Sequence, residues 1–230
     1  MMRAMLSLVI PTLNAEAGLP ATLATLAAAR ASGLVGDVLI TDGGSIDQTR
    51  RIAEANGCQV LAAPRGRGQQ LATGAAAARG DWLLFLHADT RLAAGWEATV
   101  QGFMADPGNL QRAACFGFAL DDNSPAARRL ERLVAWRCQT FALPYGDQGL
   151  LLSRPFYQAL GGYRPLPLME DVDLVRRIGR HRLVMLDMPA ITSAAKWQRQ
   201  GYWQRSAKNL SLLLLYFLGL PPRILAGLYR

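Results

Sequence analysis

The chain has 230 residues, of which 51% are hydrophobic and 18% are charged. This balance supplies a sizeable core and excludes an intrinsically disordered protein. The excess of 25 Lys and Arg over 17 Asp and Glu gives a net charge of +8, which suits phosphorylated small molecules or an anionic membrane surface. Because the arginines are dispersed and lack an interleaved aromatic array, we predict no nucleic-acid partner.

Short apolar runs alternate with helix-like segments through the first half of the chain. We expect strands at 5–10, 37–40, 58–61 and 82–87, and helices at 18–31 and 69–79. A further helix ending near Ala55 is expected to open on the capping box formed by Ser45 and Gln48. This alternation predicts an α/β fold, with a mainly parallel sheet covered by helices on both faces. In such sheets, ligands bind beyond the carboxyl ends of the strands.

The rhythm changes after residue 105. A long amphipathic helix is expected at 125–141, followed by a loop at 143–149 and a helix-like segment at 172–178. No low-complexity linker or repeat interrupts the sequence. We therefore predict one domain over 1–230, with a nucleotide half at about 1–105, an acceptor half at about 106–204, and apolar C-terminal helices at about 205–230.

The C-terminal segment 210–220 is strongly apolar, and Pro221 and Pro222 follow it directly. It has about half of the ~20 residues that a membrane-spanning helix needs. A core helix is the favoured interpretation. Flanking cations keep peripheral membrane contact through 205–230 open as an alternative, and a homodimer interface is another; the cations are Arg205, Lys208, Arg223 and Arg230.

Three scattered cysteines, Cys58, Cys115 and Cys138, form no close pair. Such a set is typical of buried thiols in a reducing compartment. The first residues run into a strand-like segment, without the apolar stretch and cleavage site of a secretory signal. We expect a cytoplasmic protein, at the inner face of the cytoplasmic membrane if the C-terminal segment contacts lipid.

Two junctions between an expected strand and a helix carry groups that suit a nucleotide. Asp42 follows the second strand, and its carboxylate can accept a hydrogen bond from a base or ribose, although the same residues also make an ordinary loop. Arg65 and Arg67 precede the Ala-rich helix and can neutralise a diphosphate, or stand solvated on a loop. Leu71 occupies the position of the third glycine of a dinucleotide fingerprint, so that motif is absent.

Two acidic motifs could take part in catalysis. His87 and Asp89 end a buried strand and can supply part of the coordination shell of a divalent ion, with the alternative of a hydrogen-bonded His beside a capping Asp. Glu170 and Asp171 begin a helix, where an acidic pair is often only a cap. A carboxylate held there can also accept a proton from a hydroxyl nucleophile, since the helix dipole keeps it ionised.

Taken in order, these motifs resemble the family 2 glycosyltransferases with the GT-A fold, from about Leu6 to the end of the chain. The likeness is strongest to a bacterial subgroup of radical-SAM/selenodomain-associated transferases, some of which are linked to arsenosugar biosynthesis. The residues that carry it are 10–14 (IPTLN), 42–45 (DGGS), 66–68 (GRG), 86–90 (LHADT), 146–149 (GDQG) and 170–171 (ED).

The resemblance implies a role for each motif. It places the nucleotide-sugar donor on Pro11, Thr12, Asn14, Asp42, Gly43, Ser45, Arg67, His87, Ala88 and Asp89. It implies that Asp171, with Glu170 beside it, supplies the catalytic base, and that Asp89 and His87 hold a divalent metal, Mn or Mg. It also implies acceptor contacts from Asp147, Gln148, Lys196 and Trp197.

Three positions depart from the family pattern. His87 stands at the first Asp of the family's Asp-x-Asp element, and this imidazole shifts preference from Mg towards Mn. Gly43 replaces the second Asp of the usual Asp-Asp-Gly-Ser. Lys196 replaces an Arg and loses its planar bidentate contact.

The resemblance implies an inverting transfer of a sugar from a nucleotide-sugar, by family habit a UDP-sugar with GDP left open, to a hydroxyl acceptor that the sequence does not identify. One alternative is a nucleotidyltransferase, but 11–16 lack the basic phosphate loop that it needs after the first strand. Another is an inactive sugar-nucleotide-binding or membrane-surface scaffold, against which the intact Asp89 and Asp171 argue.

Overall fold

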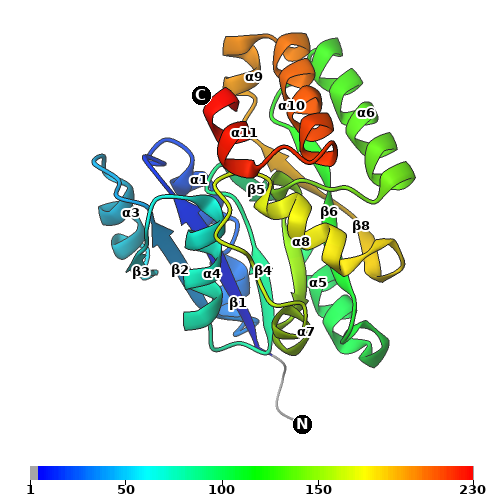
Figure 1. Ribbon diagram of the computed structural model, residues 1–230. Coiled ribbons are helices and arrows are strands. Elements are labelled where there is room, and N and C mark those ends of the chain that lie inside the picture. Colours follow the sequence, from blue (N-terminus) through cyan, green and yellow to red (C-terminus); the bar gives the residue numbers. More distant parts are fainter. Residues whose placement is uncertain (1–4, 230) are drawn as a thin grey trace.

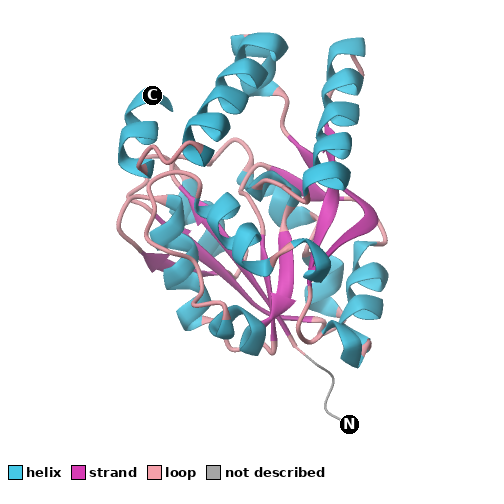
Figure 2. Cartoon of the chain, turned by 45° about the vertical axis from the view of Figure 1, so that its right-hand side comes forward, coloured by secondary structure: helices cyan, strands magenta, loops and turns pink. Residues whose placement is uncertain are grey.

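A computed structural model describes residues 5–229 and shows one eight-stranded sheet with helices on both faces (Figures 1 and 2). The strand order is β3-β2-β1-β4-β7-β6-β8-β5. The first four strands in the chain are parallel and contain the apolar runs expected from the sequence; they are β1 (Leu6–Thr12), β2 (Val35–Asp42), β3 (Gln59–Ala62) and β4 (Trp82–Phe85). Their carboxyl ends meet at one edge, as a parallel arrangement requires.

The second half of the sheet is mixed. β7 (Leu150–Ser153) is antiparallel to β4, and β6 (Ala113–Leu120) is antiparallel to β7. β8 (Leu183–Thr192) is parallel to β6, and the short β5 (Thr90–Leu92) pairs antiparallel with β8. The pairing of β5 with β8 matters for function, because it brings the segment after Thr192 beside the residues that follow β4.

Side chains of the central strands alternate between two cores, one on each face of the sheet. Leu8 and Ile10 pack into the larger core with α1, α2 and α5, whereas Val9 packs into the second core with α4, α7 and α8. This two-residue alternation is what a strand buried on both faces produces. The helices are α1 (Leu19–Ala24), α2 (Ala27–Ala31), α3 (Thr49–Ala55), α4 (Arg67–Ala77), α5 (Trp96–Ala105), α6 (Pro125–Phe141), α7 (Arg154–Ala159), α8 (Glu170–Ile178), α9 (Ala195–Gln200), α10 (Tyr202–Phe217) and α11 (Pro222–Tyr229), with short 3-10 turns η1 (Pro107–Asn109), η2 (Gly146–Gln148) and η3 (Arg180–Arg182).

Several local expectations need correction. The helix expected at 18–31 is divided into α1 and α2. The capping-box prediction is wrong, because α3 begins at Thr49, and Asp47 rather than Ser45 accepts the Thr49 N–H. β4 ends at Phe85, two residues earlier than expected, so His87 lies in the following loop.

The expectation of a C-terminal core helix holds for one face of α10 only. Leu212 and Leu213 are buried, and Leu212 packs in a small core cluster with Leu225 of α11. On the other face, Leu210 and Leu214 are 64% and 59% exposed. No helix within residues 5–229 combines the length and apolarity needed to cross a membrane.

Candidate active site

Two adjoining cavities form one cleft beyond the carboxyl ends of β1 and β4. The larger cavity has a volume of about 870 Å³ and the smaller about 150 Å³, and the larger lies within the range typical of small-molecule sites. Both are lined by Arg67, His87, Asp89 and Lys196. These four side chains therefore stand where the two cavities meet.

Most of the predicted donor residues line the larger cavity, but three do not. Those that line it are Pro11, Thr12, Asn14, Arg67, His87, Ala88 and Asp89. Asp42, Gly43 and Ser45 lie outside it. The structure thus brings seven of the ten together at the strand ends.

Asp42 is 3% exposed and its carboxylate is occupied by its own chain. Oδ1 accepts from the Thr12 hydroxyl at 3.1 Å and the Ser45 hydroxyl at 2.5 Å, and Oδ2 accepts from the backbone N–H groups of Gly44 and Ser45. Burial raises the pKa of Asp42, but these hydrogen bonds outweigh it, so the pKa is lowered. In this structure Asp42 holds the loops after β1 and β2.

Gln70 completes this support and was missed by the sequence analysis. Its side-chain amide donates to the carbonyls of Thr12 and Thr41, both at 2.7 Å, and ties α4 to the ends of two strands. An amide in an Ala-rich helix gives no sequence signal of this contact.

His87 is uncharged at neutral pH. Burial, and then the charge of Arg67, lower its pKa to about 4. Gly146 lies against the ring, since a Cβ there would be 2.6 Å from Nε2 of His87. A neutral imidazole is the form that binds a metal ion.

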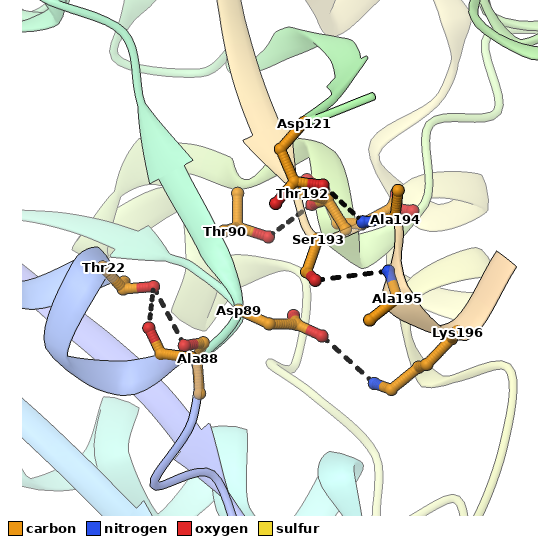
Figure 3. A network of polar contacts seen from close by, with 12 residues as sticks. Thr22, Ala88, Asp89, Thr90, Asp121, Thr192, Ser193, Ala194, Ala195 and Lys196 are labelled. Atoms are coloured by element: carbon orange, nitrogen blue, oxygen red, sulfur yellow. Dashed lines mark hydrogen bonds and ion pairs between the residues drawn. The ribbon is translucent and has the colours of Figure 1, made fainter. Parts of the chain in front are cut away.

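Asp89 is paired with Lys196, whose ammonium lies 3.1 Å from Oδ2 (Figure 3). The sheet produces this contact, because Thr90 pairs with Thr192 and the Ser193 N–H donates to the Asp89 carbonyl at 3.1 Å. Burial raises the pKa of Asp89, but the charge and hydrogen bond of the Lys196 ammonium outweigh burial, so the pKa is lowered and the carboxylate is ionised. Lys196 was predicted to contact the acceptor; it also lies against the predicted metal ligand.

Arg67 and Glu170 form an ion pair of 3.1 Å between the N-termini of α4 and α8. The Glu170 side chain is 2% exposed, and its Oε2 has no hydrogen-bond partner. Burial raises the pKa of Glu170, and the Arg67 guanidinium limits that rise. Glu170 lines neither cavity, so the structure separates it from its predicted catalytic partner.

Asp171 faces the smaller cavity from the first turn of α8. Its Oδ2 accepts the Gly146 N–H and its Oδ1 accepts the Val172 N–H, both at 2.8 Å. These bonds fix the carboxylate beside the loop at 145–148 while leaving it open to the cavity. The geometry fits a group that receives a proton from a bound hydroxyl.

The predicted acceptor residues lie in different places. Asp147 and Trp197 line the smaller cavity, and burial, opposed by Arg137, raises the pKa of Asp147 to about 6. Gln148 is fully buried, donates to the Phe116 carbonyl at 3.0 Å, and lines neither cavity. The structure does not bring Gln148 to the cleft.

The C-terminal helices supply a wall of the cleft that the sequence analysis missed. Arg205 and Asn209 of α10 and Tyr229 of α11 line both cavities, and Leu212 lines the smaller one. The spacing of 205, 209 and 212 places these α10 residues on one helix face. This face was not predicted from the sequence, because the apolar run at 210–220 indicated a core helix.

The side chains of His87 and Asp89 suit a divalent ion that takes its remaining coordinating atoms from a bound ligand. His87 and Asp89 reach the same cavity, one neutral and one ionised. Residues 5–229 contain no cluster of three His, Cys, Asp or Glu suited to a metal. Mg²⁺ and similar ions are commonly held by one or two protein ligands plus phosphate oxygens, so these two residues are sufficient only with a phosphorylated ligand.

The model of glycosyl transferase family 2 matches residues 7–153, and the chain belongs to this family. It is a glycosyltransferase with a GT-A-like α/β fold. A search of curated protein sequences finds no significant match.

Solved structures of glucosyl-3-phosphoglycerate synthase from Mycobacterium tuberculosis share this fold. The complex with Mn²⁺, UDP and glucosyl-3-phosphoglycerate aligns with a TM-score of 0.59 and 21% identity, over 81% of this chain and 70% of that one. The complex with Mn²⁺, UDP-glucose and phosphoglyceric acid gives the same values. A complex with Mg²⁺ and UDP aligns with a TM-score of 0.59 and 20% identity, over the same shares of the two chains.

Gly146→Ala is expected to reduce sugar transfer at least tenfold. The new methyl group would be 2.6 Å from Nε2 of His87, so the imidazole must move, while its distance of 3.5 Å from Oδ2 of Asp171 is an ordinary contact. Initial-rate assays measure the loss, and the NMR signals of the His87 imidazole report its displacement. Gly102→Ala is the control, because a Cβ there meets nothing within 4 Å. Unchanged rate and His87 signals in Gly146→Ala would contradict this assignment.

Lys196→Met is expected to tighten Mn²⁺ binding about fivefold, which corresponds to about 1 kcal/mol for a partly exposed ion pair. The ammonium competes with the metal for Asp89 at 3.1 Å. Electron paramagnetic resonance of free Mn²⁺ measures the Kd in saturating UDP without sugar, since His87 and Asp89 are sufficient only with a phosphorylated ligand. Arg199→Met removes a charge from the same cavity without breaking an ion pair to Asp89 and should change the Kd less. A Kd that stays constant or weakens in Lys196→Met would show that Lys196 does not occupy the metal's carboxylate.

Proposed function

We propose that this glycosyltransferase moves a sugar from a UDP-sugar to a hydroxyl acceptor with inversion at the anomeric carbon. The observation that carries the proposal is the charge of the larger cavity. Asp89 is its one carboxylate among the lining residues, against the cations Arg65, Arg67, Lys196, Arg199, Arg205 and Lys208. A cleft with this excess suits a diphosphate.

The choice of UDP is supported by structures of the same fold. The mycobacterial enzyme is described in complexes with UDP and with UDP-glucose. In this chain the base and ribose would lie against Pro11, Thr12 and Asn14 at the end of β1, on the loop that Asp42 stabilises. We propose an indirect role in donor binding for Asp42, Gly43 and Ser45, through that loop.

We assign the catalytic base to Asp171. An acceptor hydroxyl in the smaller cavity would give its proton to the Asp171 carboxylate while its oxygen attacks the anomeric carbon. The bond from that carbon to the diphosphate oxygen breaks, and the electron pair leaves with UDP. Glu170 would serve as a positioning residue, since its ion pair holds Arg67 beside the departing diphosphate.

A divalent metal, Mn²⁺ or Mg²⁺, would be held by Asp89 and His87. When bound, it would stabilise negative charge on the leaving diphosphate. The imidazole favours Mn²⁺ over Mg²⁺, and the mycobacterial structures contain either ion. Lys196 would have to share or release the Asp89 carboxylate when the ion binds.

The smaller cavity is proposed to receive the acceptor. Asp147 and Trp197 line it together with Asp171, and its small volume favours a compact hydroxyl-bearing group at the reaction centre.

Motifs such as His87 to Thr90 support placement in the radical-SAM/selenodomain-associated subgroup. The antiparallel pairing of β4 with β7 joins the donor half at about 1–105 to the acceptor half at about 106–204, in keeping with one catalytic domain. Buried, free cysteines support a cytoplasmic location.

Asp171→Asn is expected to lower the rate of sugar transfer by 10²–10⁴-fold, about the contribution of a general base. UDP affinity should stay within twofold of the wild-type value, because Asp171 does not line the larger cavity. UDP release from UDP-glucose with a panel of hydroxyl acceptors measures the rate, and titration calorimetry measures UDP binding.

Asp187→Asn serves as the control, since Asp187 is exposed and lines neither cavity. Full turnover in Asp171→Asn would remove the base assignment. Tight UDP binding by a wild-type protein that releases no UDP from any UDP-sugar would favour the inactive scaffold instead.

A further inference from the structure

The outward face of α10 is apolar. Trp203, Leu210, Leu214 and Phe217 are 72%, 64%, 59% and 46% exposed. They recur at intervals of three, four and seven residues, so they form one stripe along the helix. A stripe of this kind normally faces a core, and here it faces solvent.

The stripe lies on the opposite side of α10 from the cleft. Arg205 and Leu212 line the smaller cavity, and each is two residues from a member of the stripe, about 200° around a helix of 3.6 residues per turn. A body that covered the stripe would therefore leave the cleft open. The stripe has no part in the donor or acceptor assignments above.

Two more helices also carry exposed apolar side chains. Among the described residues, ten of the thirteen exposed large hydrophobic side chains lie on α6, α10, α11 or the residue that ends α10; they are Leu133, Trp136, Phe141, Trp203, Leu210, Leu214, Phe217, Leu218, Ile224 and Leu228. These three helices occupy the same end of the molecule (Figure 1), and α6 contacts α10. We call this the α6–α10–α11 surface.

Exposed cations accompany these apolar side chains, with one acid among them. Arg128, Arg129, Arg132 and Arg223 are exposed on α6 and α11, against Glu131, whereas Arg205 and Lys208 line the cleft. Glu131 is itself paired with Arg128 at 2.7 Å. From α8, the Arg176 guanidinium lies 5.1 Å from the centre of the Phe217 ring and adds positive charge at the edge of the stripe.

We propose that the α6–α10–α11 surface docks on an anionic membrane. Exposed Trp, Phe and Leu beside Arg and Lys are the composition of a helix that lies in the plane of a lipid interface. With 16 residues, α10 is too short to span the bilayer and would lie along it. A second copy of the chain fits less well, because a two-fold interface would set this positive surface against itself.

Vesicle sedimentation of the full chain tests this proposal. Wild-type protein is expected to bind vesicles of 30% phosphatidylglycerol in phosphatidylcholine at least tenfold more tightly than pure phosphatidylcholine, and to weaken as salt rises. Leu210→Gln/Leu214→Gln should lower the partition coefficient at least tenfold. Leu110→Gln is the matched control, because Leu110 is 52% exposed and lies at the end of η1, away from these helices. Its partition coefficient should stay within twofold of the wild-type value.

UDP titration of each variant separates this proposal from the proposed function. Wild-type UDP affinity in the Gln variants would show that the fold and cleft are intact. Failure of UDP binding in the wild type and in every variant would count against the proposed donor site and not against the membrane proposal. Absence of binding to the anionic vesicles would overturn the membrane proposal. A dimer in sedimentation equilibrium that Leu210→Gln/Leu214→Gln converts to monomer would also overturn it, in favour of a second copy.

Discussion

The ion pair between Arg67 and Glu170 is the contact on which the arrangement of the cleft depends. It joins the N-terminus of α4, which carries the donor side, to the N-terminus of α8, which carries Asp171. Removing Arg67 would leave a buried carboxylate without its partner, which is costly in proteins. Close packing reinforces the pair, because a Cβ on Gly68 would lie 2.3 Å from the Arg164 carbonyl oxygen. These contacts hold the donor side and the acceptor side of the cleft in a fixed position relative to each other.

Electrostatics then divides the cleft into two chemical environments. The larger cavity collects cations and receives negative charge, whereas the smaller one contains Asp171 and Asp147. Lys196 lies where the two cavities meet and forms an ion pair with Asp89. The two residues are far apart in sequence, and the pairing of β5 with β8 brings them together. Without a ligand, this ammonium offsets the carboxylate that a metal would use. Binding of a metal and a diphosphate therefore requires a local exchange of charge partners.

Much of the parallel half could be predicted from the sequence, because each strand buried on both faces is a continuous apolar run, as at Leu6–Thr12. Seven of the ten predicted donor residues line the larger cavity, since the ends of parallel strands converge. The mixed half could not be predicted, because pairings such as β5 with β8 link residues about a hundred positions apart. Burial explains the rest. Gln148 and Asp42 were predicted to bind ligands, but their side chains hold loops. The apolar run at 210–220 did not indicate that α10 has one buried and one exposed face.

The most direct test of the central claim is calorimetric titration of the protein with UDP and GDP, in Mn²⁺, in Mg²⁺ and without metal. UDP is expected to bind more tightly than GDP, Mn²⁺ is expected to strengthen binding most, and Asp89→Ala is expected to remove the metal dependence. Absence of binding by either nucleotide under every condition would contradict this proposal, because the larger cavity, with six cations and one carboxylate among its lining residues, would then have no diphosphate to receive.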